Sequence, residues 1–302
     1  MRAGPASERE RERRSAVGGL PLLGLALLVA AVLPVAAAAD EPLVLKPEDA
    51  AILPLAAMPI ELRQRVTFVV VKRTLRRVMT SEPFASSLEG YTFLLDHLPL
   101  AARLAAALAI DRYRIEATAP GQFFGDDQSG LTGNFTVAYQ ATGRRIYYGE
   151  GVYVGALLPR MSGRTVMVLE FHPIERQGRP FVETRLTVYL RLEQRPLRYL
   201  LKPLLPLVSG LVNRKLSRFL TAARRLSEAL AAEPRQTWRE VQQSQTLSEA
   251  DKRCVRQLLS RLPGAGDLAA AAEEVDSPSD EAPYPEAAGN SAAAADACAA
   301  SP

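Results

Sequence analysis

Alternation between apolar and polar side chains dominates the middle of the chain. From residue 111 to 192 apolar residues recur at every second position, in stretches separated by turn residues. The cleanest stretch is 182–192, where Val182, Leu186, Val188 and Leu190 share one face. A period of two is typical of strands, and short turns between sequential strands indicate an antiparallel meander. We therefore predict five or six strands here, with one dry and one wet face.

A helical period follows the strands. Between residues 196 and 232 apolar residues recur every three or four positions, and basic residues occupy most of the others. The apolar positions are Val208, Val212, Leu216, Phe219, Ala223, Leu226 and Leu230. This pattern predicts an amphipathic helix that is long enough to cover the dry face of the sheet.

Two shorter helices are predicted between residues 81 and 110, where leucine and alanine recur at helical spacing. Pro99 should divide them, because proline favours the first turn of a helix and restricts the residue before it. His97 is then a helix-end residue. Before these helices, the β-branched run Val66–Val71 predicts the first strand.

The first 39 residues have the three parts of a secretory signal peptide. Five arginines precede an uncharged stretch from Ala16 to Ala39, and Ala37-Ala38-Ala39 fits a small-residue cleavage site. We therefore expect an exported protein, in the bacterial periplasm or outside the cell. The uncharged stretch is also long enough to stay as an N-terminal membrane anchor, so cleavage and retention both remain open.

Three other segments flank a predicted domain of residues 61–232. Prolines recur through 40–60, which predicts an extended arm. Residues 233–262 are expected to form a linker and a short helix capped by Ser248, and 263–302 a disordered, acidic, Ala-rich tail. Cys254 and Cys298 could form a disulfide in an oxidising compartment or remain free thiols.

Charge is distributed unevenly along the chain. The formal net charge is +4, but residues 263–302 carry eight Asp/Glu and no Lys or Arg, and residues 1–39 carry five Arg and three Glu. The body from 40 to 262 therefore has 32 basic and 22 acidic residues and is near +10. A basic body suggests anionic lipid headgroups, an acidic partner or its own acidic tail as neighbours. Nucleic acid is not expected, because export argues against it and no nucleic-acid-binding motif is present.

The order of predicted elements resembles the START-like helix-grip (SRPBCC) superfamily, which includes lipid-transfer START domains, polyketide cyclases and coenzyme Q-binding proteins. The resemblance lies in VTFVVVKRTL, YTFLLDHLPLAARLAAALAI, and ETRLTVYLRL running into PLRYLLKPLLPLVSGLVNRKLSRFLTAARRLSEAL. It covers about residues 62–232 and includes no catalytic signature. It implies an α+β fold in which a curved antiparallel sheet grips the long C-terminal helix, with a ligand cavity between them.

Candidate lining residues of that cavity follow from the alternation and the helical period. They are Phe135, Tyr139, Tyr148, Glu150, Leu186, Val188, Leu190, Val212, Leu216 and Phe219. Burial would raise the pKa of the Glu150 carboxyl and suit it to proton transfer. Alternatively, a bulge at Gly149 and Gly151 shifts the register and places Glu150 in water.

Other chemistry has little support. Glu170 and His172 share the strand face opposite the core, so an exposed pair is expected. Two histidines and two cysteines do not make a zinc site, the Asp126–Asp127 loop lacks the spaced ligands of calcium, and no G-x-S-x-G motif occurs. We predict no cofactor, metal or catalytic residue.

Three functions follow from these observations. The first is a non-enzymatic binder or carrier of a lipid or isoprenoid that contacts an anionic membrane peripherally. The second is a cyclase- or hydrolase-like enzyme that uses the same cavity. The third is an envelope scaffold or interaction protein that binds partners through its basic helix and acidic tail.

Overall fold

The computed structural model describes residues 43–155, 158, 160–193, 201–262 and 298, and only the backbone of 201–204. The chain divides into two compact units, residues 1–42 and 43–302, and every described residue belongs to the second. The predicted signal segment and the acidic tail, apart from Cys298, lie outside the described residues.

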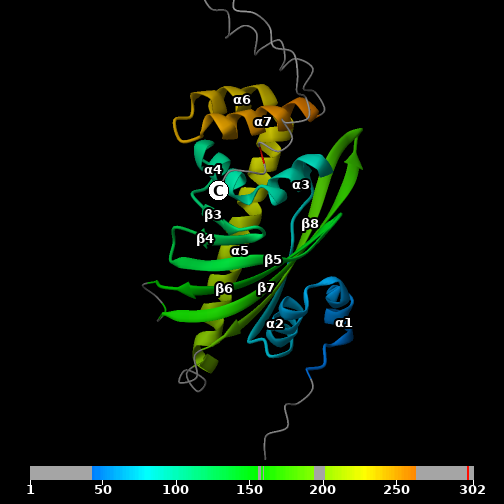
Figure 1. Ribbon diagram of the computed structural model, residues 1–302, viewed down its shortest axis with the longest axis vertical. Helices are drawn as coiled ribbons and strands as arrows, with labels where there is room; N and C mark the ends of the chain where they lie inside the picture. The colour runs from blue at the N-terminus through cyan, green and yellow to red at the C-terminus, as the bar shows by residue number, and fades with distance from the viewer. Residues whose placement is uncertain (1–42, 156–157, 159, 194–200, 263–297, 299–302) are drawn as a thin grey trace, which may run out of the picture. The chain divides into compact units, whose positions relative to one another are not determined.

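An antiparallel sheet forms the centre of the domain (Figure 1). Its strands follow the order β1-β8-β7-β6-β5-β4-β3, and the short β2 pairs with β8. The strands are β1 (Leu75–Thr80), β2 (Phe84–Ala85), β3 (Arg114–Ala119), β4 (Gln122–Asp126), β5 (Leu131–Ala141), β6 (Arg144–Tyr153), β7 (Met161–Arg176) and β8 (Arg179–Leu192). The predicted meander is confirmed as β3 to β8.

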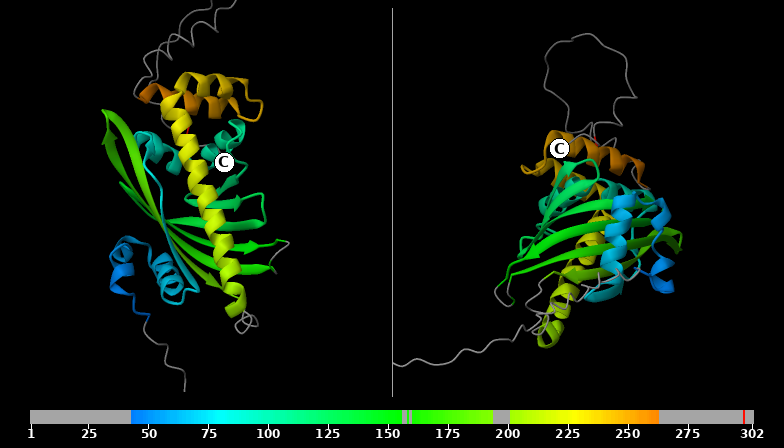
Figure 2. Two further views of the ribbon diagram at one scale, coloured as in Figure 1. Left: turned by 180° about the vertical axis from the view of Figure 1, so that it is seen from behind. Right: turned by 60° about the horizontal axis from the view of Figure 1, so that its bottom comes forward.

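Helix α5 (Leu201–Ala232) lies along one face of this sheet (Figure 2). Among the strands, β1 and β2 lie closest to its backbone. Leu216 and Phe219 pack against the core cluster that contains Val188 of β8, as does Met167 of β7. The long helix and the α+β fold class predicted from the sequence are therefore confirmed.

The first strand does not lie where the sequence predicted it. Val66–Val71 belongs to helix α2 (Ile60–Val71), and β1 begins only at Leu75. Val66, Val69 and Val70 are fully buried, and their spacing places them on one side of the helix. Burial of this apolar side outweighs the weak strand preference of β-branched residues.

Helix α2 covers the sheet face opposite to α5 (Figure 2). The short helices α1 (Pro47–Ala50) and η1 (Leu55–Ala57) precede it, in the segment expected to be extended. Val166, Val168 and Tyr189 are fully buried beneath this layer. The expectation of a wet face is wrong for these strands, because they carry apolar side chains on both faces.

Helices α3 (Leu88–Asp96) and α4 (Leu98–Ala107) confirm the predicted pair that follows β1. His97 separates them, and Pro99 lies in the first turn of α4. The backbone N–H of His97 donates to the carbonyl of Phe93, and the His97 carbonyl accepts from Ala101. Its place at a helix end explains His97 without any role as a ligand.

Helices α6 (Pro234–Gln243) and α7 (Glu249–Arg261) pack at the C-terminal end of α5 (Figure 1). Ser248 caps α7 in a capping box with Asp251, as predicted, whereas α6 was expected to be part of a linker. Arg103 of α4 contacts Asp251 at 2.6 Å and holds the pair against α4. Cys254 of α7 is joined to Cys298 by a disulfide, with their Cα atoms 5.5 Å apart.

A β-bulge in β5 decides which side chains face α5. The register between β5 and β6 shifts between Val137 and Tyr139. Strands β6 and β7 pair without interruption through Gly149 and Gly151, so the bulge predicted there is wrong. Because Ala138 is the extra residue, Val137 faces α5 and Tyr139 faces α2.

Candidate functional site

The sheet surface that faces α5 carries most of the predicted lining residues. Val137, Tyr147, Met167 and Val188 are directly paired in one row across β5 to β8, and Met167 and Val188 pack with residues of α5. The predicted residues on this side are Phe135, Leu186, Val188 and Leu190 of the sheet and Val212, Leu216 and Phe219 of α5.

Three predicted residues lie on the other side of the sheet. Tyr139 and Tyr148 belong to the core beneath α2. The hydroxyl of Tyr148 donates to a carboxylate oxygen of Glu150 at 2.5 Å, and the side chain of Glu150 is 51% exposed. Glu150 therefore lies in water, as the alternative expected, but no bulge is needed to place it there.

Tyr147 is the residue that the sequence analysis missed. It neighbours Tyr148 in the chain, so it projects from the opposite face, toward α5. Tyr147 is only 6% exposed, and its hydroxyl has no hydrogen-bond partner among the described residues. Burial raises the pKa of this hydroxyl. The charge of Arg145 lowers the pKa, and the charge of Asp96 raises it, by smaller amounts. Tyr147 therefore remains a neutral O–H group at physiological pH.

Aromatic side chains surround Tyr147. The rings of Phe123 and Phe135 are stacked with centroids 5.2 Å apart, and Phe135 meets Tyr147 edge to face at 6.1 Å. Phe123, Phe135 and Phe219 all keep partial solvent exposure. This part of the α5-facing surface is thus apolar but less completely buried than the cluster around Leu169 and Phe171.

A row of glycines crosses the same surface. Gly125, Gly133, Gly151 and Gly163 are directly paired from β4 to β7. A Cβ at Gly133 would overlap the Glu150 carbonyl and come within 2.7 Å of the Gly151 Cα. The nearest atoms at every one of these glycines come from the sheet and not from α5. The glycines therefore let the backbones of neighbouring strands approach closely, and they leave this strip of the sheet without side chains.

The ion pair of Arg145 and Asp96 lies beside Tyr147. Arg145 is 4% exposed, and its Nη2 donates to the Asp96 Oδ1 at 2.7 Å. Its Nη1 donates to the Ala141 carbonyl at 2.5 Å. Arg145 and Asp96 already engage each other, whereas the Tyr147 hydroxyl has no hydrogen-bond partner among the described residues.

Two basic residues of α5 hold the helix to the β4–β5 end of the sheet. Lys215 is paired with Asp127 and donates to the Ser129 carbonyl at 2.8 Å. Arg218 forms a two-point contact with Asp111, one arm of which measures 2.9 Å. We call Lys215, Arg218, Asp111 and Asp127 the clamp. The Asp126–Asp127 loop is therefore an anchor for α5.

The described residues contain no cluster of His, Cys, Asp and Glu suited to a metal ion. Each of the three buried carboxylates in the described ranges, Asp49, Asp127 and Asp251, is ion-paired. His172 is exposed as expected, while Glu170 is paired with Arg144 at 2.8 Å. Among the helices that the structure describes, none has the length and apolarity to cross a membrane.

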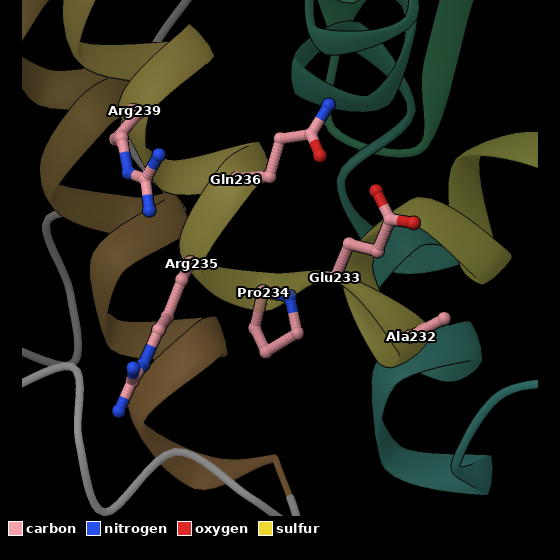
Figure 3. A pocket seen from close by; sticks show the side chains of 6 residues that line it. All are labelled: Ala232, Glu233, Pro234, Arg235, Gln236 and Arg239. Atoms are coloured by element: carbon pink, nitrogen blue, oxygen red, sulfur yellow. The ribbon is translucent and has the colours of Figure 1, made fainter.

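Two hollows lie away from the α5-facing surface. One, of about 320 Å³, lies where α5 meets α6 and is lined by Ala232, Glu233, Pro234, Arg235, Gln236 and Arg239 (Figure 3). The other, of about 530 Å³, lies at the tip of the β7–β8 hairpin and is lined by Arg176, Gln177, Arg179 and Phe181. Both are lined by arginines, and neither contains a predicted lining residue.

No protein-family model matches the chain, and no curated protein sequence matches it. Among solved structures, a conserved protein from Geobacillus kaustophilus is similar at 12% identity, over 51% of this chain and 97% of that one, with a TM-score of 0.38. An uncharacterized protein from Rhizobium leguminosarum is similar at 16% identity, over 51% and 99%, with a TM-score of 0.31.

The di-domain ARO/CYC StfQ from the steffimycin biosynthetic pathway is also similar, at 17% identity, over 57% of this chain and 60% of that one, with a TM-score of 0.31. At these scores the similarities carry no argument about ligand or activity. The architecture described above rests on the chain's own strand pairing and helix packing.

Proposed function

We propose that this protein binds and carries a hydrophobic ligand, a lipid or an isoprenoid, between the sheet and α5, and that it catalyses no reaction on it. One observation carries the proposal. The hydroxyl of Tyr147 is buried on an aromatic surface and has no hydrogen-bond partner among the described residues.

An unpartnered buried hydroxyl is unfavourable, because it has lost its hydrogen bonds to water and gained none in return. A ligand that places an oxygen within reach of Tyr147 would restore that hydrogen bond. Its apolar remainder would lie along Phe123, Phe135 and the glycine row. Apolar walls with few polar groups are typical of sites for small hydrophobic molecules.

The alternatives have less support. The enzyme hypothesis used Glu150 as its buried acid, but Glu150 is half exposed on the opposite face of the sheet. The scaffold hypothesis used the basic face of α5 and the acidic tail. Lys215 and Arg218 of that face are engaged in the clamp, and the tail, apart from Cys298, lies outside the described residues. A carrier requires neither a catalytic carboxylate nor a free basic helix.

We propose that the carrier works outside the cytosol. The N-terminal segment supports export, and the Cys254–Cys298 disulfide suits an oxidising compartment. Fractionation of the native host, followed by intact mass measurement, tests both the location and the removal of residues 1–39. Recovery of the protein from the cytosol would contradict this part of the proposal.

Native mass spectrometry of the protein from its exporting host tests ligand binding directly. We expect an adduct whose mass, after extraction, belongs to an apolar molecule that contains oxygen. The sharper test compares Tyr147→Phe with Tyr148→Phe, because these neighbours undergo the same change on opposite faces. Loss of one neutral hydrogen bond should weaken binding about five- to tenfold in Tyr147→Phe, and Tyr148→Phe should bind like the wild type.

Two results would overturn the proposal. One is a protein that carries no adduct and takes up no offered lipid or isoprenoid. The other is equal affinity in the wild type and both variants, which would show that Tyr147 does not contact the ligand.

A further inference from the structure

The β7–β8 hairpin carries a surface that the proposed carrier function does not use. Arg176 and Arg179 are directly paired across its two-residue turn, in which Gln177 and Gly178 have φ of 54° and 72°. Two residues farther from the turn along each strand, Ile174 is paired with Phe181, and this pair lies on the same face of the sheet as the two arginines. This hairpin tip, defined by Ile174, Arg176, Arg179 and Phe181, therefore combines an apolar row with a basic row.

The hairpin tip lies at the end of the sheet, where the short β2 pairs with the edge of β8. Its four residues share the sheet face on which α2 covers Val166 and Val168, but they lie farther along β7 and β8. Arg176 and Arg179 are exposed, and Ile174 and Phe181 are half-buried. Figure 1 shows the β7–β8 hairpin extending away from α1 and α2.

No carboxylate of the described chain neutralises the two arginines. Neither Arg176 nor Arg179 forms an ion pair with a described residue, whereas Arg144 and Arg164 of neighbouring strands both do. Glu175 is next to Arg176 in the chain but projects from the opposite face. The guanidinium of Arg176 lies over the Phe181 ring at 6.0 Å, beside the hollow of about 530 Å³ that these residues line.

We propose that the hairpin tip is a docking site for an anionic bilayer surface, and that the hollow receives a lipid phosphate. Arginine is well suited to phosphate, because its planar fork of donors fits the phosphate oxygens. Phe181 and Ile174 supply the short apolar row that an interfacial segment places at the boundary with the acyl chains. The basic body of the protein adds a favourable long-range attraction to the same surface.

The next pair of residues along the hairpin limits the area that can contact the membrane. His172 and Glu183 are paired there, on the same face as Ile174 and Phe181. An acidic side chain would be repelled by anionic headgroups, so the contact ends at the row of Ile174 and Phe181. Docking thus involves the end of the hairpin and leaves the α5-facing surface free.

Hydrogen–deuterium exchange of the full chain on vesicles tests this proposal locally. A local measurement is needed because the apolar stretch Ala16–Ala39 could itself hold the protein on vesicles. The vesicles are phosphatidylcholine with or without an equal part of phosphatidylglycerol. We expect slower exchange at residues 174–181 on the vesicles that contain phosphatidylglycerol and no change on the phosphatidylcholine vesicles. This protection should be lost gradually as salt is added.

Arg176→Gln with Arg179→Gln should abolish the slower exchange at residues 174–181 on the anionic vesicles. The matched control is Arg235→Gln with Arg239→Gln, which removes the same charge from the arginine-lined hollow at α6 (Figure 3). The control should retain the protection, and Trp238 fluorescence should report an intact fold in both double variants.

Several outcomes would overturn the proposal. These are equal protection on neutral vesicles, equal losses in both double variants, the same protection with inorganic phosphate alone, or protection that rises with protein concentration without vesicles. Failure here leaves the carrier proposal standing, because ligand mass and the Tyr147→Phe comparison are measured without membranes.

Discussion

The carboxylate of Asp49 accepts a hydrogen bond from the hydroxyl of Tyr189 at 2.6 Å, although 140 residues separate them in the chain. Asp49 is fully buried and also contacts Arg73 at 3.0 Å and Arg76 at 3.5 Å. Both guanidinium groups lie within 6 Å of the Tyr189 ring. This cluster fixes α1 to the face of β8 that α2 also covers.

Replacing Asp49 should therefore destabilise the domain. Asp49→Ala would leave the Tyr189 hydroxyl and two partly buried guanidinium groups without their shared acceptor, at a cost of about 3 kcal/mol. Urea denaturation followed by Trp238 fluorescence measures the change. Glu48→Ala alters the exposed neighbour in the same helix and should change the free energy of unfolding by less than about 0.5 kcal/mol. Similar losses in both variants would contradict this account.

Removal of the Tyr147 hydroxyl should have the opposite effect on the ligand-free protein. Tyr147→Phe deletes a buried polar group that has no partner, so the free energy of unfolding should rise by about 1 kcal/mol. Tyr148→Phe breaks the bond to Glu150 and should lower it by about 1 kcal/mol. Thermal or chemical denaturation of delipidated protein measures both. A loss of stability in Tyr147→Phe would mean that its hydroxyl has a partner.

The clamp should depend on pH. Burial raises the pKa of the Asp127 carboxyl, but hydrogen bonds from Lys215 and from the backbone of Leu131 and Ser129 outweigh it, so the net shift is downward. A carboxyl whose pKa is lower in the folded state stabilises the fold above its unfolded pKa of about 3.9, and this contribution disappears as pH falls through the folded value.

Asp127→Asn should therefore destabilise the protein at neutral pH, and the difference from the wild type should shrink in acid. The free energy of unfolding, measured from pH 7 down to the acid limit of folding, gives the comparison. Asp126→Asn is the control, because Asp126 contacts Gln128 and forms no ion pair with a described residue. A difference that stays constant with pH would contradict an electrostatic role for Asp127.

The glycine row predicts a contrast between two substitutions. Gly133→Ala would drive a Cβ into the backbone of Glu150 and Gly151, and should cost about 3 kcal/mol or more, since the backbone of β6 cannot move aside easily. Gly210→Ala in α5 meets no atom within 4 Å and should stabilise by about 0.5–1 kcal/mol through helix propensity. Chemical denaturation measures both, and an unaffected Gly133→Ala would contradict the close strand approach.

Sequence patterns predicted the elements whose periods are long and clean. The alternation in 182–192 and the helical period in 205–230 each extend over many residues. A single residue that departs from the pattern therefore does not change the predicted element. The run Val66–Val71 was too short to separate a buried strand from one side of a buried helix. Its helical state depends on an apolar outer sheet face that only the assembled strands provide.

The candidate site was harder to predict because side-chain direction depends on register. A single extra residue, Ala138, moves Tyr139 away from α5. Tyr147 was passed over because Tyr148 fitted the assumed dry face, although both faces of β6 are covered. The adjacent tyrosines on a strand with valine and isoleucine are the signal that could have indicated burial on both sides.

The Cys254–Cys298 bond makes the end of the chain a covalent ring, because the two cysteines are 44 residues apart and their sulfurs are joined. A protease that cuts once between residues 263 and 297 would open the ring without releasing any piece. After one such cut, the C-terminal fragment stays attached through the disulfide and separates only when a reductant breaks that bond.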